Sequence, residues 1–287
     1  MMKTVLITGC STGLGVAVAV GAARAGHAVY ATMRDLGRRG ALDAAAAEAG
    51  VEVHVRALDV QHRASIDSVV AEIIDTEGRI DVVVNNAGIG FVRTLEHATE
   101  DEIQRVVDIN QLGVMRCTQA VLPHLRRQRS GHVIVVSSVG GLVGQPFNEI
   151  YCATKFAVEG FIEGLASYVG PTFGIDFSVI EPGGISSAFA ANVMADLQAS
   201  GGLGSEEYQE MFARYRDAVA STPWEHPVSQ TPEEVAEVVL EVMEAEEPPI
   251  RRRTSPWAEQ VTELKTGLDP DGRRLQRQVM ADFFGMR

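Results

Sequence analysis

The stretch Thr4-Val5-Leu6-Ile7-Thr8-Gly9-Cys10-Ser11-Thr12-Gly13-Leu14-Gly15 decides which fold this chain can adopt. Its first half is a short apolar run rich in β-branched residues, which predicts a buried strand; its second half is a glycine-rich turn that opens a helical pattern. Glycines let the backbone turn tightly and approach a pyrophosphate, whose charge then lies at the helix N-terminus. A plain tight turn would use the same glycines, but a position after the first strand of an α/β chain favours a dinucleotide site.

Strand and helix patterns alternate along the chain beyond this stretch. The pattern predicts buried strands at 4–8, 27–32, 51–57, 81–85, 132–137 and 176–181, and helices at 15–25, 41–49, 65–77, 100–125 and 150–169. Capping boxes are expected at Thr99-Glu100-Asp101-Glu102 and Thr231-Pro232-Glu233-Glu234. Such alternation produces right-handed βαβ units. We therefore expect one α/β domain with a doubly wound, Rossmann-type parallel sheet and helices on both faces.

One long insertion interrupts this alternation. Residues 186–230 follow the sixth predicted strand and contain the glycine run Gly201-Gly202-Leu203-Gly204 and an aromatic helical segment near 208–215. Insertions of this length in compact domains are usually functional. The sequence predicts a helical lid over the substrate, with the glycine run as a hinge.

Composition excludes several classes of function. The 287 residues are 46% apolar and 22% charged, and no run is apolar for long enough to span a membrane. With 25 basic and 38 acidic residues the net charge is −13, so the basic footprint that nucleic-acid binding needs is absent. The one basic cluster, Arg251-Arg252-Arg253, is predicted to be a solvated turn or a local ion pair.

The cysteines and histidines indicate neither disulfides nor a metal site. Cys10, Cys117 and Cys152 are scattered, and the seven histidines form no metal pattern. The N-terminal residues lack a signal-peptide layout. We expect reduced thiols, a cytoplasmic location and no bound metal, with Cys152 as a small packing residue.

Several motifs, taken in chain order, resemble those of the short-chain dehydrogenase/reductase family. The T-G-x-x-x-G-x-G spacing of residues 8–15 is followed by Asp59-Val60, Asn85-Asn86-Ala87-Gly88 and Pro182-Gly183, each after a predicted strand. The resemblance covers essentially the whole chain and implies an NAD(P)-dependent oxidoreductase with Ser187 where the family commonly has threonine. It implies a cofactor site made of Thr8, Gly9, Ser11, Thr12, Gly13, Leu14, Gly15, Arg34, Asp59, Val60, Asn86, Ala87, Gly88, Tyr151, Lys155, Pro182, Gly183, Ile185 and Ser187.

The residues after the second predicted strand favour NADP(H), with NAD(H) still usable. In NAD-binding proteins an acidic side chain there accepts hydrogen bonds from the ribose 2′-hydroxyl. That position is assigned to Thr32, followed by Met33 and Arg34. An arginine can grip a 2′-phosphate bidentately. Asp35 could pair with Arg34 and weaken this preference.

A catalytic set is predicted from four polar residues. Tyr151 and Lys155 are four apart at the start of a helical pattern, so they share one face. A tyrosine pKa of about 10 is too high for proton exchange at neutral pH, and a neighbouring ammonium, helped by oxidised nicotinamide, would lower it. Ser138 closes the fifth predicted strand, and Asn110 lies in the predicted helix 100–125. The four match the family's Asn-Ser-Tyr-Lys tetrad, which implies that Ser138 holds the substrate oxygen and that Asn110 anchors a proton-relaying water.

Each of these residues also has a structural explanation. A lone Y-x-x-x-K is a common surface pair, an asparagine inside a helix can cap or kink it, and a serine that ends a strand often starts a turn. Ser137 competes with Ser138 for the hydroxyl role. Neighbours in a strand face opposite ways, and the thirteen-residue offset to Tyr151 favours Ser138.

Longer stretches resemble one branch of the family. Residues 29–36, 138–156 and 232–238 are similar to the estradiol-type hydroxysteroid dehydrogenases and the photoreceptor-type retinol dehydrogenases. This implies a bulky, largely apolar ketone, aldehyde or alcohol as substrate. Rival functions are an acyl-carrier-protein ketoreductase, an epimerase or dehydratase, and a non-catalytic cofactor sensor. The candidate pocket walls are Val143, Phe147, Phe189, Phe212, Tyr215 and Trp224, of which Trp224 could equally anchor the insertion to the core.

The helical pattern at 150–169 is apolar beyond one face. A helix apolar that far round needs cover on a second side. Family members pair this helix and the one at 100–125 across a two-fold axis. The resemblance therefore implies a homodimer or homotetramer.

Overall fold

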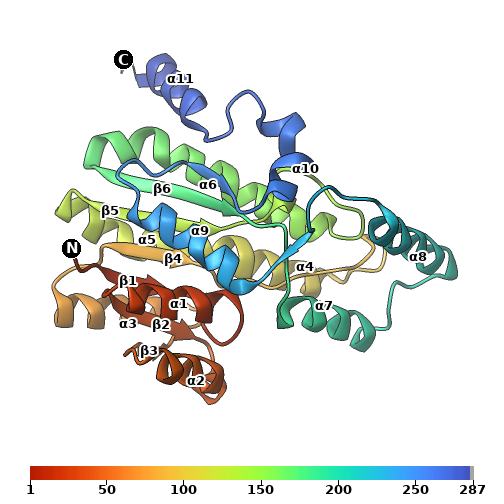
Figure 1. Ribbon diagram of the computed structural model, residues 1–287, viewed down its shortest axis with the longest axis horizontal. Coiled ribbons are helices and arrows are strands. Elements are labelled where there is room, and N and C mark those ends of the chain that lie inside the picture. Colours follow the sequence, from red (N-terminus) through yellow and green to blue (C-terminus); the bar gives the residue numbers. More distant parts are fainter. Residues whose placement is uncertain (285–287) are drawn as a thin grey trace.

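A seven-stranded sheet forms the centre of the molecule (Figure 1). The computed structural model describes residues 1–284. The strand order is β3-β2-β1-β4-β5-β6-β9, and all neighbouring strands are parallel. The order reverses between β1 and β4, where open α/β sheets bind ligands beyond their carboxyl ends. The strands are β1 (Thr4–Ile7), β2 (Ala28–Met33), β3 (His54–Ala57), β4 (Val82–Asn85), β5 (Gly131–Val136), β6 (Ile175–Glu181) and β9 (Arg251–Arg253).

Helices cover both faces of the sheet, so the doubly wound prediction is confirmed. On one face α1 (Leu14–Arg24), α2 (Gly40–Ala49) and α9 (Pro232–Glu244) bury one apolar cluster against the strands. On the other face α3 (Arg63–Glu77), α5 (Gly113–Gln128) and α6 (Glu149–Phe173) bury a second cluster. Burial of apolar side chains on both faces explains why the central strands are almost entirely apolar.

The edges of the sheet differ from the prediction. The third strand begins at His54 rather than at residue 51, and its side chains are exposed or half-buried. Burial on both faces is therefore wrong for this strand, because β3 lies at the edge of the sheet and pairs only with β2.

The predicted helix at 100–125 is interrupted. It divides into α4 (Glu100–Val107), a π-helical turn (Asp108–Leu112) and α5. A π turn inserts an extra residue into the helical register and often occurs at functional sites. Asn110 lies in this turn.

Both predicted capping boxes are confirmed. The Thr99 hydroxyl accepts from the Glu102 N–H at 3.2 Å, and Glu102 accepts from the Thr99 N–H at 2.8 Å. Thr231 and Glu234 form the same reciprocal pair at 3.1 and 2.7 Å, with a proline at the start of α9. These contacts satisfy backbone donors that a helix start leaves free.

The two ends of the insertion lie side by side at the edge of the domain. The short strands β7 (Gly184–Ile185) and β8 (Ser229–Gln230) pair in parallel at its two ends. Between them lie α7 (Ala188–Ala199) and α8 (Glu206–Ser221). The glycine run makes the connection between these helices, and Gly201, Gly202 and Gly204 all have a φ between 78° and 88°. Only glycine adopts this left-handed backbone readily.

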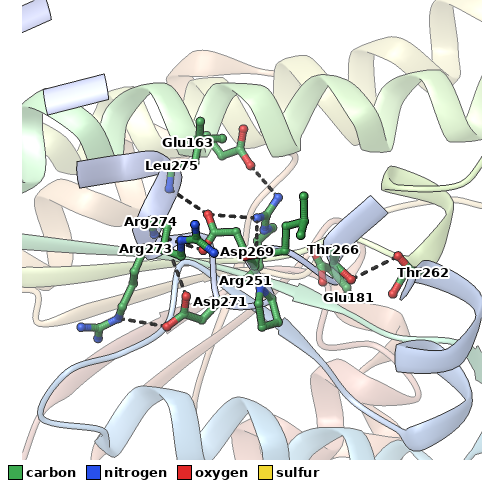
Figure 2. Close-up of polar contacts among 12 residues, drawn as sticks. Glu163, Glu181, Arg251, Thr262, Thr266, Asp269, Asp271, Arg273, Arg274 and Leu275 are labelled. Atoms are coloured by element: carbon green, nitrogen blue, oxygen red, sulfur yellow. Dashed lines mark hydrogen bonds and ion pairs between the residues drawn. The ribbon is translucent and has the colours of Figure 1, made fainter. Parts of the chain in front are cut away.

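The prediction of a solvated turn at 251–253 is wrong, and that of a local ion pair is confirmed. These residues form β9, which pairs with β6. Arg253 Nη1 lies 3.1 Å from Glu181 Oε2 and Arg253 Nε 2.8 Å from Glu259 Oε2. Figure 2 shows Arg251 between Glu163 of α6 and Asp269. The sequence pattern did not predict this strand, because its residues are all charged. Each inward arginine is paired with an acidic residue far away in the sequence, Glu163 for Arg251 and Glu181 for Arg253.

The C-terminal helices α10 (Pro256–Thr266) and α11 (Arg273–Phe284) follow β9. The Gln276 side chain donates to the Ala166 carbonyl at 2.7 Å, so α11 packs on α6. Two short 3₁₀ turns complete the described chain, at Leu36–Arg38 after β2 and at Val139–Gly141 after β5.

The two arginines at the end of β9 give a matched test of this burial. Arg253→Ala leaves the fully buried Glu181 without its cation, so we expect a loss of about 3–5 kcal/mol in the free energy of unfolding. Arg252→Ala removes an exposed pair with Glu241 and should cost at most about 1 kcal/mol. Urea unfolding at pH 7 measures both. Equal losses would contradict the assignment of Arg253 to the core.

Candidate active site

The glycine loop packs directly against the segment that follows β4. A Cβ on Gly9, whose φ is 76°, would lie 2.7 Å from the Ala87 Cα, and a Cβ on Gly15 would lie 2.3 Å from the Gly9 carbonyl oxygen. The Thr8 hydroxyl accepts from the N–H groups of Asn86 and Ala87, each at 3.0 Å. No larger residue fits at either glycine, so the loop and the Asn86-Ala87 segment form one unit.

The N-terminus of α1 is suited to an anion. Gly13 precedes the helix with a φ of 58°, no side chain caps the helix start, and its first turn contains no acidic residue. Ser11 and Thr12 are half-buried and exposed, respectively. Free N–H groups and the helix dipole favour a phosphate at this point. The loop therefore fits the pyrophosphate of a dinucleotide.

The other predicted cofactor residues gather at the same edge of the sheet. Asp59 follows β3 and accepts from the Gln61 N–H at 3.0 Å, and Val60 is buried against Gly113. After β6, the Pro182 carbonyl accepts from the Val139 N–H at 2.9 Å. The parallel register brings these strand ends together, because carboxyl ends of parallel strands share one edge.

Ser187 connects this edge to the insertion. Its hydroxyl caps α7 by accepting from the Phe189 N–H at 3.3 Å. A Cβ on Gly13 would lie 3.3 Å from the Ser187 Cβ. Gly183 and Ile185, which lie between Pro182 and Ser187, are half-buried. The glycine loop and the start of α7 thus face each other across the edge.

The structure corrects the residue assigned to the cofactor's 2′ position. Thr32 lies inside β2, is buried, and donates its hydroxyl to the Ile7 carbonyl at 3.0 Å. Arg34 is the first exposed side chain after the strand. Asp35 accepts from the Gly37 N–H at 2.9 Å, and no ion pair with Arg34 occurs within residues 1–284. The predicted strand, 27–32, is displaced by one residue from β2, so Thr32 lies inside the strand and not after it.

Asn110 is held by the backbone of Ile89, shortly after the Asn86-Ala87 segment that packs on the glycine loop. Its Oδ1 accepts from the Ile89 N–H and its Nδ2 donates to the Ile89 carbonyl, both at 2.8 Å. A Cβ on Gly88 would lie 3.3 Å from Asn110 Oδ1 and 3.8 Å from Lys155 Nζ. The π turn therefore brings Asn110 close to the lysine, as the sequence predicted.

Ser138, Tyr151 and Lys155 also converge. A Cβ on Gly140 would lie 3.4 Å from both Ser138 Oγ and Tyr151 Cε1. The Lys155 Nζ lies 5.6 Å from the Tyr151 ring centroid and donates to the Val136 carbonyl at 2.9 Å. The four predicted catalytic side chains thus lie together: Ser138 just after β5, Tyr151 and Lys155 on α6, and Asn110 in the π turn.

Burial sets the protonation of this group. It raises the pKa of Tyr151 to about 12, against a lowering by the hydrogen bond from Ser138. It lowers the pKa of Lys155 to about 8, and only an ionised Glu159 would oppose this. The lysine was expected to lower the pKa of the tyrosine, but in the protein without cofactor the effect of burial is larger. The Lys155 ammonium is bound to the Val136 carbonyl and not to the phenol. The adjacent Cys152 is buried, as expected of a packing residue.

The predicted pocket residues fall into three places. Phe147 packs on Phe212 of α8 with ring centroids 5.1 Å apart, and the Tyr151 and Phe189 centroids are 6.3 Å apart. Val143 is half-buried, and its carbonyl faces the Cys152 thiol at 3.9 Å. Trp224 instead packs on Trp257 at 5.7 Å, so it anchors the insertion to α10.

The backbone at Phe147 is strained. Its φ is 63°, which residues other than glycine rarely adopt. The Phe147 carbonyl accepts from the Arg93 N–H at 3.0 Å. The buried Arg93 guanidinium binds the carbonyl of Ser200 at 2.8 Å, that of Gly202, and Glu102 at 3.1 Å. One arginine thus fastens the tip of the insertion over the aromatic cluster.

Two buried carboxyl groups escaped the sequence analysis. Glu159 lies one helical turn after Lys155, and Glu181 directly precedes Pro182. Both are almost fully buried. The sequence did contain one signal for a buried carboxyl group: Glu159 lies four positions after Lys155 on a helix that is otherwise largely apolar. Nothing in the local pattern showed that the two would meet.

Other features lie apart from this site. A cavity of about 480 Å³ lies between Glu225-His226 and α10, and none of the predicted site residues lines it. No helix of residues 1–284 is long and apolar enough to cross a membrane. The same residues contain no group of three or more histidine, cysteine or acidic side chains that could hold a metal ion.

Comparison with known proteins identifies the family. A family model described as short chain dehydrogenase matches residues 3–198. Retinol dehydrogenase 8 of Bos taurus is 41% identical over 273 residues, which cover 94% of this chain and 86% of that protein. 17-beta-hydroxysteroid dehydrogenase type 1 of Homo sapiens is 38% identical over 290 residues, covering 99% and 87%. The crystal structure of a short-chain dehydrogenase from Streptomyces avermitilis aligns with a TM-score of 0.76 and 30% identity, covering 100% of this chain and 99% of that one.

The matched region contains the glycine loop, the segment after β4 and the Ser138-Tyr151-Lys155 group. Fold, motif order and sequence identity therefore agree. The chain is an oxidoreductase that acts on CH–OH donors, and it belongs to the short-chain dehydrogenase family.

Proposed function

We propose that this protein transfers a hydride between NADP(H) and a bulky, largely apolar ketone, aldehyde or alcohol. The observation that carries the proposal is the convergence of Tyr151, Ser138 and Lys155 at the cofactor edge of the sheet, beside the aromatic cluster under the insertion. Lining a site with apolar walls around a few fixed polar groups is typical of pockets for such ligands.

Tyr151 is the proton donor and acceptor of the proposed reaction. In reduction, NADPH held at the glycine loop would supply a hydride for the carbonyl carbon. Tyr151 gives its phenolic proton to the carbonyl oxygen, and the Ser138 hydroxyl holds that oxygen. A pKa raised to about 12 by burial keeps the phenol protonated and ready to donate at neutral pH. Oxidation runs these transfers in reverse and requires the phenolate.

Lys155 supports the phenolate and the cofactor ribose in this mechanism. Its ammonium lies near the tyrosine ring and within reach of the Asn110 turn. A cation close to a phenol stabilises the phenolate. Asn110, held on the Ile89 backbone near the ammonium, would anchor a water there.

The aromatic cluster supports the choice of substrate. Phe147, Phe212 and Tyr215 pack together, and the ring of Phe189 lies against that of Tyr151. Val143 contacts the thiol of the adjacent Cys152. The insertion that carries Phe189 and Phe212 would act as the lid, held by Arg93. Two relatives are named for retinol and a 17-beta-hydroxysteroid, both bulky and apolar.

Arg34 supports the preference for NADP(H). It is exposed directly after β2, and Asp35 is engaged by the Gly37 N–H instead of by this arginine. A free guanidinium at this position can bind a 2′-phosphate with two parallel hydrogen bonds.

The outer face of α6 supports a homodimer or homotetramer. The exposed side chains of Phe156 and Tyr168 flank Gly160 and Gly164, at both of which a Cβ would meet no atom within 4 Å. Such a flat, partly apolar stripe suits a second copy of the same helix. We also propose a cytoplasmic location, which three free, buried cysteines support.

The substrate class is tested with a panel of carbonyl compounds and alcohols, read by NADPH absorbance. We expect steroid-sized and retinoid-sized substrates to exceed short polar ketones in kcat/KM by about tenfold or more, since apolar burial drives binding. Tyr151→Phe should abolish turnover while leaving NADPH binding within about threefold of wild type. A preference for short polar substrates, or activity retained by Tyr151→Phe, would refute the proposal.

The protonation of Lys155 predicts a pH dependence of cofactor binding. Because burial lowers the pKa of Lys155 to about 8, the free protein loses this positive charge as the pH rises through that value. The dissociation constant for NADPH should therefore be flat below pH 8 and rise above it, by up to about tenfold per pH unit. Fluorescence titration measures it. Lys155→Met should bind weakly without this rise, whereas Lys265→Met should behave as wild type.

The cofactor preference is tested at Arg34. Arg34→Ala should weaken NADPH binding by about tenfold, the value of one charge-assisted contact, and leave NADH binding unchanged. Arg24→Ala, an exposed arginine at the far end of α1, is the control. Equal effects of Arg34→Ala on both cofactors would show that this residue does not read the 2′ position.

The oligomeric state is tested at Gly164. Multi-angle light scattering of wild type should give at least twice the mass of the chain. Gly164→Glu adds a charge to the outer face of α6 without a clash inside one chain, so it should yield monomers. Ala44→Glu on the exposed face of α2 is the matched control. A monomeric wild type would rule out the proposed interface.

A further inference from the structure

Two carboxyl groups lie directly behind the proposed catalytic side chains. Glu159 of α6 is 6% exposed and Glu181 at the end of β6 is 0% exposed. Glu159 follows Lys155 by one helical turn, and Glu181 precedes the turn that Pro182 begins. The mechanism described above uses neither group.

Three of the four carboxyl oxygens of this pair are buried without a hydrogen-bond partner among residues 1–284. They are both oxygens of Glu159 and Oε1 of Glu181; Oε2 of Glu181 is paired with Arg253 at 3.1 Å. An ionised carboxylate only accepts hydrogen bonds, so two ionised groups cannot satisfy each other. Buried acceptors and buried like charges are both costly. A single proton placed between the two groups removes the repulsion and creates a donor.

The surrounding charges are insufficient for two anions. Facing the pair are Arg253 and Arg251 from β9, and Lys155 and Glu163 from α6. Arg251 is engaged by Glu163 and Asp269 (Figure 2), and Arg253 is shared with Glu259 of α10. Arg253 is thus the one arginine available to the pair, and it contacts Glu181.

The hydroxyl of Ser137 completes the cluster. Ser137 Oγ and Glu159 Oε1 lie 2.7 and 2.8 Å from the position that a Cβ on Gly141 would take, so the two groups are neighbours. Burial and the charge of Glu181 raise the pKa of Glu159, and Ser137 opposes this. Burial raises the pKa of Glu181 to about 7, against the charge of Arg253. The directions agree with a pair that retains a proton at neutral pH.

We propose that Glu159 and Glu181 share one proton, and that Glu159, kept neutral in this way, is a positioning residue for Lys155. An ionised Glu159 one turn away would become the counter-ion of the lysine and draw its ammonium towards α10 and β9. A neutral Glu159 leaves the ammonium on the Val136 carbonyl, beside Tyr151. The second half of this inference rests on the proposed function, and the first half does not.

The shared proton is tested by infrared spectroscopy of the protein without cofactor or substrate at pH 7. The spectrum of wild type minus Glu159→Gln should contain the carbonyl stretch of one protonated carboxylic acid, shifted in D₂O. Glu149→Gln, an exposed residue at the start of α6, should give no such band. Absence of the band from the Glu159→Gln difference would overturn the shared proton, whatever the activity of the protein.

The positioning role is tested by two variants of similar size. Glutamine can donate a hydrogen bond to Glu181 without a charge, whereas methionine cannot. We expect Glu159→Gln to retain kcat/KM within about threefold at pH 7 and Glu159→Met to lose about tenfold or more, mainly in kcat. Equal losses in both variants would show that an uncharged hydrogen-bond donor does not suffice, and full activity in both would remove any role; either result would overturn the positioning role. Loss of turnover in Tyr151→Phe, measured alongside, separates these outcomes from failure of the proposed mechanism.

Discussion

The contact between the glycine loop and the segment after β4 is the constraint on which the rest of the structure depends. Gly9 and Gly15 bring two backbones so close that no Cβ fits between them, and Thr8 and Asn86 lock the contact with hydrogen bonds. This fixes the start of α1 at the point where the strand order reverses. Strand ends on both sides of that point share one edge of the sheet, so the predicted cofactor residues after β1, β2, β3, β4 and β6 are brought together there.

Polar groups buried behind the site extend this arrangement to the far edge of the sheet. Lys155 is held by a carbonyl of β5, Glu159 and Glu181 meet between α6 and β6, and Arg253 of β9 supplies the nearest cation. Such a chain is costly to bury, because each group must find a partner in a medium that screens little. It also links the conformation of α6 to that of the turn at Pro182, since a shift in either would leave a charge unpaired.

The insertion is attached to the domain at a few points and does not pack into the sheet. Its two ends are joined by the β7–β8 pair, its tip is fastened by Arg93, and its inner face contributes aromatic rings to a separate small cluster. The strained backbone at Phe147 is maintained where this cluster meets the domain. Few elements cross between the two parts, so the walls of the site can vary while the catalytic group, which belongs to the sheet and α6, stays in place.

Local sequence by itself determined most of the elements and indicated which side chains to propose as the catalytic group. Periodicity predicts the central strands and most helices, glycine spacing predicts the loop, and the four-residue offset places Tyr151 and Lys155 on one face, because these features depend on neighbours within one or two turns. Only the tertiary structure decided the rest. The sequence of β9 is as charged as a solvated turn, and its inward arginines are paired only because the fold brings Glu181 and Glu163 to them. Asn110 lies in a π turn, and Thr32 lies buried inside β2 rather than after it. The meeting of Glu159 with Glu181, and of Phe147 with Phe212, joins residues on different elements. Contacts of that kind follow from how elements pack, which no short pattern encodes.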